Sequence, residues 1–209
     1  LMRGPEGTTV RLLIERTVRD EVELIEVEIV RAIVEVDSVS KTLVIEPSEH
    51  FPFLTGRMGY IRISNFSLRT DSELRQALHS AVHEHRVNGI ILDLRDNPGG
   101  VFRASLEVAN QFIPDGPLVH IVGRSGEPRS YHAYPDYAVQ GLPPLVVLVN
   151  QHSASASEIV AGALQDRGRA VIVGERTYGK GLVQTIFPLQ QGALSVTTDC
   201  YQTAGGRFI

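Results

Sequence analysis

Three serines, Ser153, Ser155 and Ser157, occupy alternate positions in the stretch VNQHSASASEIVAGALQD (149–166). The stretch starts at the end of an apolar run and continues into a helical pattern, so Ser155 lies at a predicted strand–turn–helix corner. The free backbone N–H groups of a first helical turn stabilise a negatively charged oxygen. A serine at such a corner is therefore a candidate nucleophile for acyl transfer.

A structural role for the same serine stays open at this point. Ser155 and Glu158 have the S-x-x-E spacing of a capping box, in which the serine only holds the start of the helix. A nucleophilic serine also needs a base. His152 lies in the same tight turn, where its ring would be badly placed for the hydroxyl. No Ser–His–Asp arrangement is legible elsewhere in the sequence.

A lysine is the other candidate base. The stretch GERTYGKGLVQTIF (174–187) places Lys180 between two glycines and Gln184 four positions later. Glycine permits close approach of the backbone. In a strand, Lys180 and Gln184 would share a face, so the amide of Gln184 could orient the lysine amine. The alternative is a solvated lysine in a glycine turn, which is the usual environment of lysine.

The sequence does not favour a metal site. His79 and His83 have i, i+4 spacing and His85 follows closely, but no carboxylates of matching period accompany them, so we expect solvated residues of one helix. The single cysteine, Cys200, excludes an internal disulfide and a zinc site built from several cysteines.

Apolar strands and amphipathic helices alternate through most of the chain, which predicts an α/β layered core. We expect strands at 59–66, 89–95, 117–124, 144–150 and 170–176, helices at 70–86, 103–113 and 156–168, and a closing β-pair at 181–187 and 193–203. Thr70 and Glu73 again have capping-box spacing. Period-two alternation indicates β-structure before residue 36, and the proline- and glycine-containing stretch 46–59 is expected to connect the two parts.

Bulk properties narrow the function classes. The 209 residues are 43% hydrophobic and 21% charged, which is typical of a globular protein of one domain, or of one domain plus part of another. The net charge of −4 without a basic stripe argues against nucleic-acid binding. The longest apolar runs are too short to cross a bilayer. No secretory signal is visible, so we expect any such segment to lie outside this sequence.

Three stretches taken together resemble the carboxyl-terminal processing proteases, also called tail-specific proteases. They are GIILDLRDNPGG (89–100), VNQHSASASEIVAGALQD and VGERTYGKGLVQT (173–185), supported by GYIRISNF (59–66) and the terminal TTDCYQTAGGRFI. The order and spacing of these motifs carry the resemblance, which covers nearly the whole chain. It implies a core similar to that of crotonase and the Clp-type protease, preceded by a PDZ domain.

The resemblance implies a serine–lysine dyad assisted by a glutamine. The nucleophile falls on Ser155, the base on Lys180 and the orienting glutamine on Gln184. The backbone N–H groups expected to receive the oxyanion are those of Ala156 and of Gly99 or Gly100. Asp166 matches an aspartate that supports the site. No metal or cofactor is implied.

The resemblance also implies domains. Residues 1–35 are expected to be the last part of a PDZ domain, 36–58 a connecting segment, and 59–209 the serine protease core, so the chain is interpreted as a fragment. One departure from the family is His152, which stands where a glycine is frequent. Histidine tolerates positive φ better than most residues, so we expect the turn to survive.

The sequence therefore predicts a serine endopeptidase that cleaves proteins with apolar or unfolded carboxyl-terminal tails, located outside the cytoplasm in the periplasm, cell envelope or thylakoid lumen. One alternative is a ligand-binding module on the same core, similar to retinoid-binding repeats that lack proteolysis. The presence of Ser155, Lys180 and Gln184 together disfavours it. A second is a crotonase-like acyl-group enzyme, which does not require a Ser/Lys pair.

Overall fold

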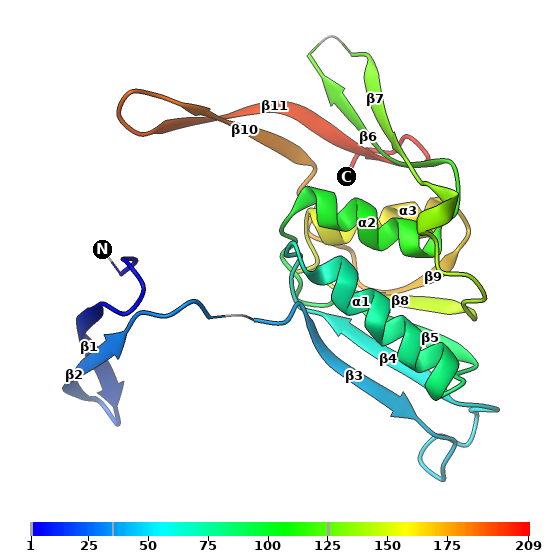
Figure 1. Ribbon diagram of the computed structural model, residues 1–209, viewed down its shortest axis with the longest axis horizontal. Coiled ribbons are helices and arrows are strands. Elements are labelled where there is room, and N and C mark those ends of the chain that lie inside the picture. The colour runs from blue at the N-terminus through cyan, green and yellow to red at the C-terminus, as the bar shows by residue number, and fades with distance from the viewer. Residues whose placement is uncertain (1, 35, 125) are drawn as a thin grey trace. The chain divides into compact units, whose positions relative to one another are not determined.

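The computed structural model describes every residue except 1, 35 and 125, and it divides into two compact units, Leu1–Val36 and Asp37–Ile209. The first unit is a hairpin of β1 (Thr9–Val18) and β2 (Glu21–Val30), paired antiparallel (Figure 1). Its turn residues Arg19 and Asp20 both have positive φ, as a two-residue turn of type I′ requires. Leu13 and Leu24 are more than half exposed, so the hairpin has no hydrophobic core of its own.

A five-stranded sheet forms one layer of the second unit. Its order is β3 (Val39–Ile45), β4 (Met58–Ile63), β5 (Gly89–Asp93), β8 (Leu145–Val149) and β9 (Ala170–Gly174). The last four strands are mutually parallel, whereas β3 is antiparallel to β4. Parallel strands place their carboxyl ends at one edge of the sheet, where α/β proteins gather their functional residues.

Three helices cover one face of this sheet: α1 (Thr70–His79), continued by the π-helical turn η1 (Ser80–Glu84), α2 (Phe102–Phe112) and α3 (Ala156–Asp166). The alternate strand residues Ile61, Ile63, Ile90, Leu92 and Val147 are fully buried and belong to the main core with the helices. This burial gives α2 and α3 fixed positions, which matters because both helices begin at the candidate site.

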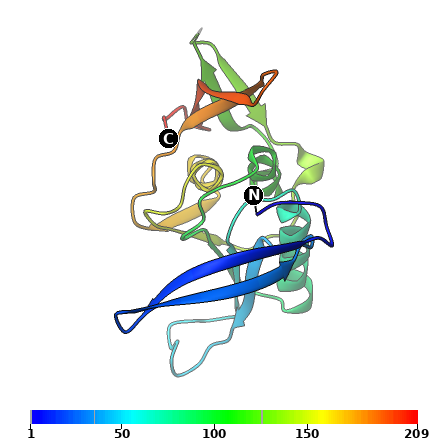
Figure 2. The same ribbon diagram turned by 90° about the vertical axis from the view of Figure 1, so that its left-hand side faces the viewer.

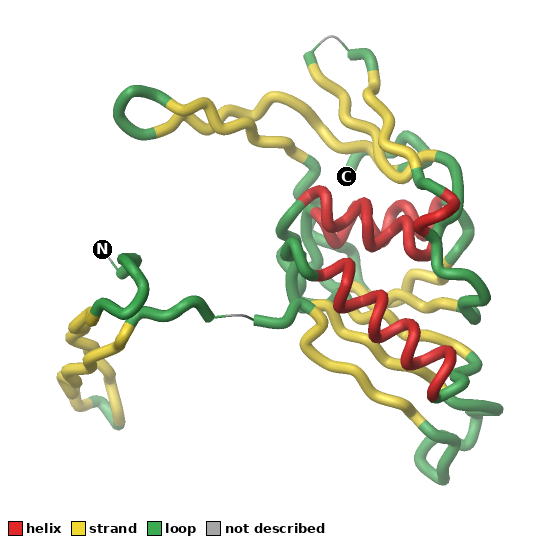
Figure 3. Tube along the Cα trace, viewed as in Figure 1, coloured by secondary structure: helices red, strands yellow, loops and turns green. Residues whose placement is uncertain are grey.

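A four-stranded antiparallel sheet forms the third layer. Its order is β10 (Leu182–Pro188), β11 (Ala193–Thr203), β6 (Pro117–Gly123) and β7 (Pro128–His132), and the short helix η2 (Pro135–Tyr137) follows β7. Helices α2 and α3 lie between the two sheets, as the views in Figures 1 and 2 show. The β10–β11 hairpin extends well beyond the helices (Figure 3).

The α/β class and most predicted elements are confirmed: every helix and strand expected between residues 59 and 203 is present, with ends differing by a few residues. The layering expected from the crotonase resemblance and the PDZ assignment stay predictions. The expected helix 70–86 changes from α-helical to π-helical at Ser80. The strands β3 and β7 were not predicted, and β3 makes part of the expected connecting segment 36–58 a strand of the core sheet.

The expected capping box at Thr70 was wrong. Glu73 turns away from the helix start, and its Oε2 accepts the backbone N–H groups of Ser38 and Val39 at 2.7 and 2.9 Å. The Thr70 hydroxyl accepts the N–H of Ser67 at 2.8 Å. The carboxylate thus ties the incoming chain to α1, a long-range contact that local spacing does not reveal.

Two further observations concern the described residues. No helix among them is long and apolar enough to cross a membrane. Nor do three or more histidine, cysteine, aspartate or glutamate side chains among them gather closely enough to hold a metal ion.

Candidate active site

Two loops meet at the carboxyl edge of the five-stranded sheet, one after β5 and one after β8. The side chain of Asn150 joins them: its Nδ2 donates to Asp96 Oδ1 at 2.8 Å, and its Oδ1 accepts the N–H of Asp96 at 2.9 Å. The carbonyl of Asn97 accepts the N–H of Ala154 at 3.0 Å. The buried amide of Asn97 donates to the carbonyl of Ile63, at the end of β4. These contacts fix the loops before either reaches its helix.

A buried carboxylate holds the end of β5 beneath the first loop. The Asp93 side chain has no exposed surface, accepts the hydroxyl of Tyr60 at 2.6 Å and is bound by the guanidinium of Arg95 at 2.7 and 2.9 Å. Burial alone would raise the pKa of Asp93, but these donors outweigh it and lower that pKa. The group therefore remains an anion that locks the strand end in place.

The three serines have different environments. Ser153 is buried, donates from Oγ to the carbonyl of Leu94 at 2.8 Å, and accepts the N–H of Asn150 at 3.0 Å. Ser157 is also buried, and its Oγ donates to the carbonyl of Asn97 at 3.0 Å. Ser155, between them, is half-buried. The outer two serines thus hold the loops together, and Ser155 is the one with accessible surface.

Ser155 has an unusual backbone, with φ 55° and ψ −111°. Non-glycine residues avoid this region, and such strain persists only where the surrounding structure enforces it, often at functional sites. The residue immediately precedes α3, so it lies at the positive end of the helix dipole. The strand–turn–helix corner expected from the sequence is present, and its strain falls on the serine itself.

The carboxylate of Glu158 links this corner to the segment that carries Lys180. Its Oε2 accepts the backbone N–H of Ser155 and that of Lys180, each at 2.8 Å, and its Oε1 accepts the N–H of Gly179 at 2.6 Å. Glu158 is 5% exposed. The capping box read from the sequence is present, but the same carboxylate also binds the Gly179–Lys180 backbone. Nothing in the local spacing signals that second contact.

Other contacts bring the lysine segment to the same corner. The N–H of Tyr178 donates to the carbonyl of Ser153 at 3.0 Å, and the carbonyl of Gly181 accepts the N–H of Tyr201 at 2.7 Å. Lys180 itself is exposed, as is Gln184. Gln184 follows an irregularity in the pairing of β10 with β11, and its Oε1 accepts the hydroxyl of Ser195 at 3.2 Å. Such irregularities redirect a side chain.

Among the expected oxyanion donors, the two glycines differ. The N–H of Gly99 donates to Asn97 Oδ1 at 2.9 Å, whereas the N–H groups of Gly100 and Ala156 have no acceptor among the described residues. A β-carbon on Gly99 would lie 2.9 Å from the Cβ of Ser155, and one on Gly100 would lie 2.1 Å from the carbonyl oxygen of Phe66. Both positions therefore require glycine for this close approach.

Asp166 lies at the other end of α3, about 16 Å along the axis from Ser155 at 1.5 Å per residue. It binds the carboxyl-terminal segment, accepting the N–H of Gly205 at 2.7 Å and pairing with Arg207. Burial alone would raise the pKa of Asp166, but the nearby polar side chain of Thr203, the N–H of Gly205 and the charge of Arg207 outweigh it and lower that pKa. The structure does not bring Asp166 to the serine.

The histidines, too, take no part in the Glu158 contacts that join the Ser155 and Lys180 segments. His152 is exposed and does not adopt the positive φ expected of it, since the strained residue of the turn is Ser155. His79 and His83 are exposed, and their rings contact each other at a tilt of 48°, with centroids 4.6 Å apart. The base candidate that shares bonds with the serine corner is thus Lys180.

Comparison with known proteins finds a protein family whose model matches most of the chain. The model of peptidase family S41 matches residues 57–209. A carboxyl-terminal-processing protease of Picosynechococcus is 39% identical over 97% of this chain and 46% of its own length. Another from Synechocystis is 48% identical over 70% of this chain and 34% of its own. The chain spans about half the length of these relatives, or less.

A solved structure shows the same likeness. That of a photosystem II D1 C-terminal processing protease matches with a TM-score of 0.75 and 33% identity, over 98% of this chain and 53% of that one. An S41 protease structure from Bacteroides fragilis matches with a TM-score of 0.65 at 19% identity, which supports the fold alone.

Proposed function

The chain belongs to peptidase family S41, and from that premise we propose that it forms the catalytic core of a serine endopeptidase that cleaves proteins near their carboxyl termini. One observation carries the proposal: a single buried carboxylate, that of Glu158, binds the backbone of both Ser155 and Lys180. A nucleophile and its base need fixed relative positions, and a shared carboxylate provides them.

In the proposed reaction, the Oγ of Ser155 attacks the scissile carbonyl and its proton passes to the neutral amine of Lys180. The carbonyl oxygen becomes an oxyanion. The free N–H groups of Gly100 and Ala156 are available to donate hydrogen bonds to it, and the positive end of the α3 dipole stabilises its charge. When the C–N bond breaks, the leaving amine takes the proton from Lys180. A water molecule, deprotonated by the amine of Lys180, then attacks the acyl-serine ester. The C–O bond to Ser155 breaks, and the proton passes from Lys180 back to the Oγ of Ser155.

Gln184 is proposed to orient the amine of Lys180 without adding charge. An aspartate in its place would favour the ammonium form, which cannot accept a proton. Because Lys180 is exposed, the bound substrate has to cover its amine and exclude water from it during the reaction. The substrate therefore completes the site.

We further propose that residues 1–35 belong to a PDZ domain that selects substrates by their carboxyl-terminal tails. PDZ domains bind such tails by adding them as a strand to a sheet. The exposed apolar residues of the β1–β2 hairpin fit a partial domain whose other strands would bury them. Relatives named as chloroplastic peptidases fit a location outside the cytoplasm, in the bacterial envelope or thylakoid lumen.

A serine-directed acylating probe tests the assignment. We expect covalent labelling of Ser155, identified by mass spectrometry, and cleavage of unfolded casein, both of which disappear in Ser155→Ala. The matched control Ser48→Ala, at an exposed serine of a distant loop, should keep both. A non-catalytic binding module and a crotonase-like enzyme would both leave Ser155 unlabelled, and that result would overturn the proposal.

A further inference from the structure

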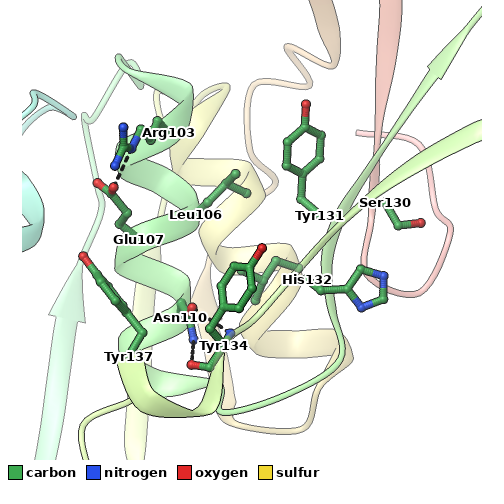
Figure 4. A pocket seen from close by; sticks show the side chains of 10 residues that line it. Arg103, Leu106, Glu107, Asn110, Ser130, Tyr131, His132, Tyr134 and Tyr137 are labelled. Atoms are coloured by element: carbon green, nitrogen blue, oxygen red, sulfur yellow. Dashed lines mark hydrogen bonds and ion pairs between the residues drawn. The ribbon is translucent and has the colours of Figure 1, made fainter.

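A cavity of about 420 Å³ lies between helix α2 and the β6–β7 hairpin (Figure 4), and Ser155 is not among the residues that line it. Its volume falls within the range of about 300 to 1,000 Å³ that is usual for binding pockets. The residues that α2 contributes, Arg103, Leu106, Glu107 and Asn110, have the i, i+3, i+4, i+7 spacing of one helix face. The cavity thus runs along the helix.

The opposite wall is the edge of a sheet. Three consecutive residues of β7, Ser130, Tyr131 and His132, line the cavity. Because successive side chains of a strand point to opposite faces, one face alone cannot supply three in a row, so the cavity meets β7 at its edge. β7 is the last strand of its sheet, and no described strand pairs with its outer side. Its outward N–H and C=O groups can therefore receive another extended chain.

The lining is close to neutral. Arg103 and Glu107 neutralise each other through a 2.7 Å contact. The amide of Asn110 is occupied by backbone groups, donating to the carbonyls of Ile113 and Tyr134 and accepting the N–H of Tyr134. Burial, reinforced by Asp71, raises the pKa of Tyr137 to about 12, so its hydroxyl stays uncharged.

Leucine and tyrosine side chains form most of the rest of the wall, and two polar residues complete it: Ser130, whose Oγ is hydrogen-bonded to His120 Nδ1 at 2.7 Å, and His132. Leu106 lies between the helix and the rings of Tyr131 and Tyr134, as Figure 4 shows. Tyr134 is 71% exposed, whereas its backbone is held by Asn110, so an accessible ring stands on a fixed backbone. Aromatic rings and a leucine around a neutral cavity suit a large apolar or aromatic side chain.

The cavity also lies within reach of the proposed reaction centre. Helix α2 starts at Phe102, two residues after Gly100, and at 1.5 Å per residue Leu106 lies about 6 Å along the helix from that start. The two residues before the helix add at most about 3.3 Å each, so Leu106 lies within about 13 Å of Gly100. An extended peptide covers about 3.3 Å per residue, so about three or four residues span that distance. This estimate gives the number of residues between the scissile bond of a bound peptide and the side chain that would enter the cavity.

We propose that this cavity is a substrate subsite: the chain being cleaved adds as a strand to β7 and places a large apolar or aromatic side chain, three or four residues from the scissile bond, against Leu106, Tyr131 and Tyr134. The proposal rests on the peptidase activity proposed above. In this proposal helix α2 has two roles: its first turn faces the reaction centre, and its next two turns contact the substrate side chain that the cavity selects.

A binding assay that does not depend on turnover tests it. Ser155→Ala protein is mixed with fluorescent twelve-residue peptides of alanine, serine and glycine in which one benzoyl-phenylalanine is moved through every position. After irradiation, we expect cross-links in the segments 103–110 and 130–137 for peptides with the probe at one or two adjacent positions. Cross-links spread over other segments, or none in these two, would overturn the proposal.

Variants then measure the contribution of the cavity. In the Ser155→Ala background, Tyr134→Ala removes a wall and Leu106→Trp fills the space. Either change should lower the affinity advantage of the optimally placed phenylalanine peptide over its alanine counterpart by 5-fold or more. Phe53→Ala, which removes a 93% exposed aromatic ring outside the cavity, should leave the advantage intact. An advantage that persists in both cavity variants would contradict the subsite.

The two proposals fail separately. Cross-links to the cavity combined with no labelling of Ser155 by the acylating probe would overturn the peptidase and, with it, the interpretation of the bound peptide as substrate. Labelling of Ser155 with position-independent cross-linking would leave the peptidase standing and overturn the subsite.

Discussion

Ser155 and Lys180 donate their backbone N–H groups to the same carboxylate oxygen, Oε2 of Glu158, at 2.8 Å each. The relative position of the two residues therefore depends on one buried side chain. A helix cap is normally a local device, but here the capping residue also ties a segment from beyond β9 to the start of α3. In the proposed reaction Glu158 binds backbone N–H groups and not the reacting atoms, so we propose it as a positioning residue.

Replacing Glu158 with glutamine should impair catalysis more than folding. The amide keeps one acceptor oxygen but loses the charge and the second acceptor, so at least one of the three backbone donors stays unpaired, at a cost of about 1–3 kcal/mol in free energy of unfolding. We expect kcat to fall at least 10-fold with KM nearly unchanged, measured on a quenched fluorescent peptide. Glu49→Gln, at an exposed loop position, is the control. Equal losses in kcat and in binding would indicate general disruption of the site.

The serines flanking Ser155 should affect stability. Ser153→Ala removes a donor to the buried carbonyl of Leu94 and an acceptor for the partly buried N–H of Asn150, and should cost about 1–3 kcal/mol in urea unfolding. Ser157→Ala removes one bond and should cost about 1 kcal/mol. Both variants should retain measurable turnover in the folded protein. Complete loss of labelling at Ser155 in folded Ser157→Ala protein would show that the loop bonds control the nucleophile directly.

The strained backbone of Ser155 gives a separate prediction. Glycine adopts φ 55°, ψ −111° at little cost, whereas alanine keeps the strain. Ser155→Gly should therefore be more stable than Ser155→Ala by about 1 kcal/mol, although both lack the hydroxyl and should be inactive. Urea unfolding of the matched pair measures the difference. Equal stabilities would mean that the turn relaxes when the side chain is removed.

Sequence reasoning found the local parts of this site and missed the long-range ones. The spacing S-x-x-E predicted a capping box at Ser155, which is present, and the same pattern predicted one at Thr70, which is absent because Glu73 binds Ser38 and Val39 instead. Local spacing is identical in the two cases, so tertiary partners decide the outcome.

Similar reasons explain the missed strands. The sequence of β7, PRSYH, starts with proline and lacks apolar alternation, as an edge strand can. The strand β3 was hidden inside a segment interpreted as a linker, although its Leu43, Val44 and Ile45 are apolar. Edge strands make half of their contacts with solvent, so their sequences carry a weaker pattern than β5 or β8, which were predicted correctly.

Lys180 should be irreplaceable by arginine. The guanidinium group stays protonated in proteins, so it can supply positive charge but cannot accept the proton of Ser155. The backbone N–H that binds Glu158 is unaffected by the substitution, which separates the role of the side chain from that of the segment. We expect Lys180→Arg to be as inactive as Lys180→Ala between neutral and alkaline pH. Near wild-type hydrolysis by Lys180→Arg would mean that the residue supplies only charge, and the proposed reaction would have to be abandoned.

Asp166 should prove to be structural, with a pH signature. Its pKa is lowered in the folded protein because the nearby polar side chain of Thr203, the N–H of Gly205 and the charge of Arg207 outweigh burial. A carboxyl group whose pKa falls on folding stabilises the protein above its unfolded pKa of about 3.9, and that stabilisation is lost as the pH falls through the lower folded value. Asp166→Asn should therefore destabilise the protein at pH 7 and pH 5 alike, and the difference from wild type in urea unfolding should shrink below about pH 4.

The same variant decides whether Asp166 has a part in catalysis. Asp166 lies at the end of α3 remote from Ser155 and binds Gly205 and Arg207 of the carboxyl-terminal segment. Folded Asp166→Asn protein should therefore keep kcat within about 2-fold of the wild-type value at 25 °C. A change of about 1.4 kcal/mol in the activation barrier would change kcat 10-fold. Arg207→Ala, which removes the partner and leaves the carboxylate, should reproduce the loss of stability at neutral pH. A large fall in kcat in Asp166→Asn without a matching fall in stability would place the aspartate in the catalytic machinery after all, and would require the carboxyl-terminal segment to move toward the serine during turnover.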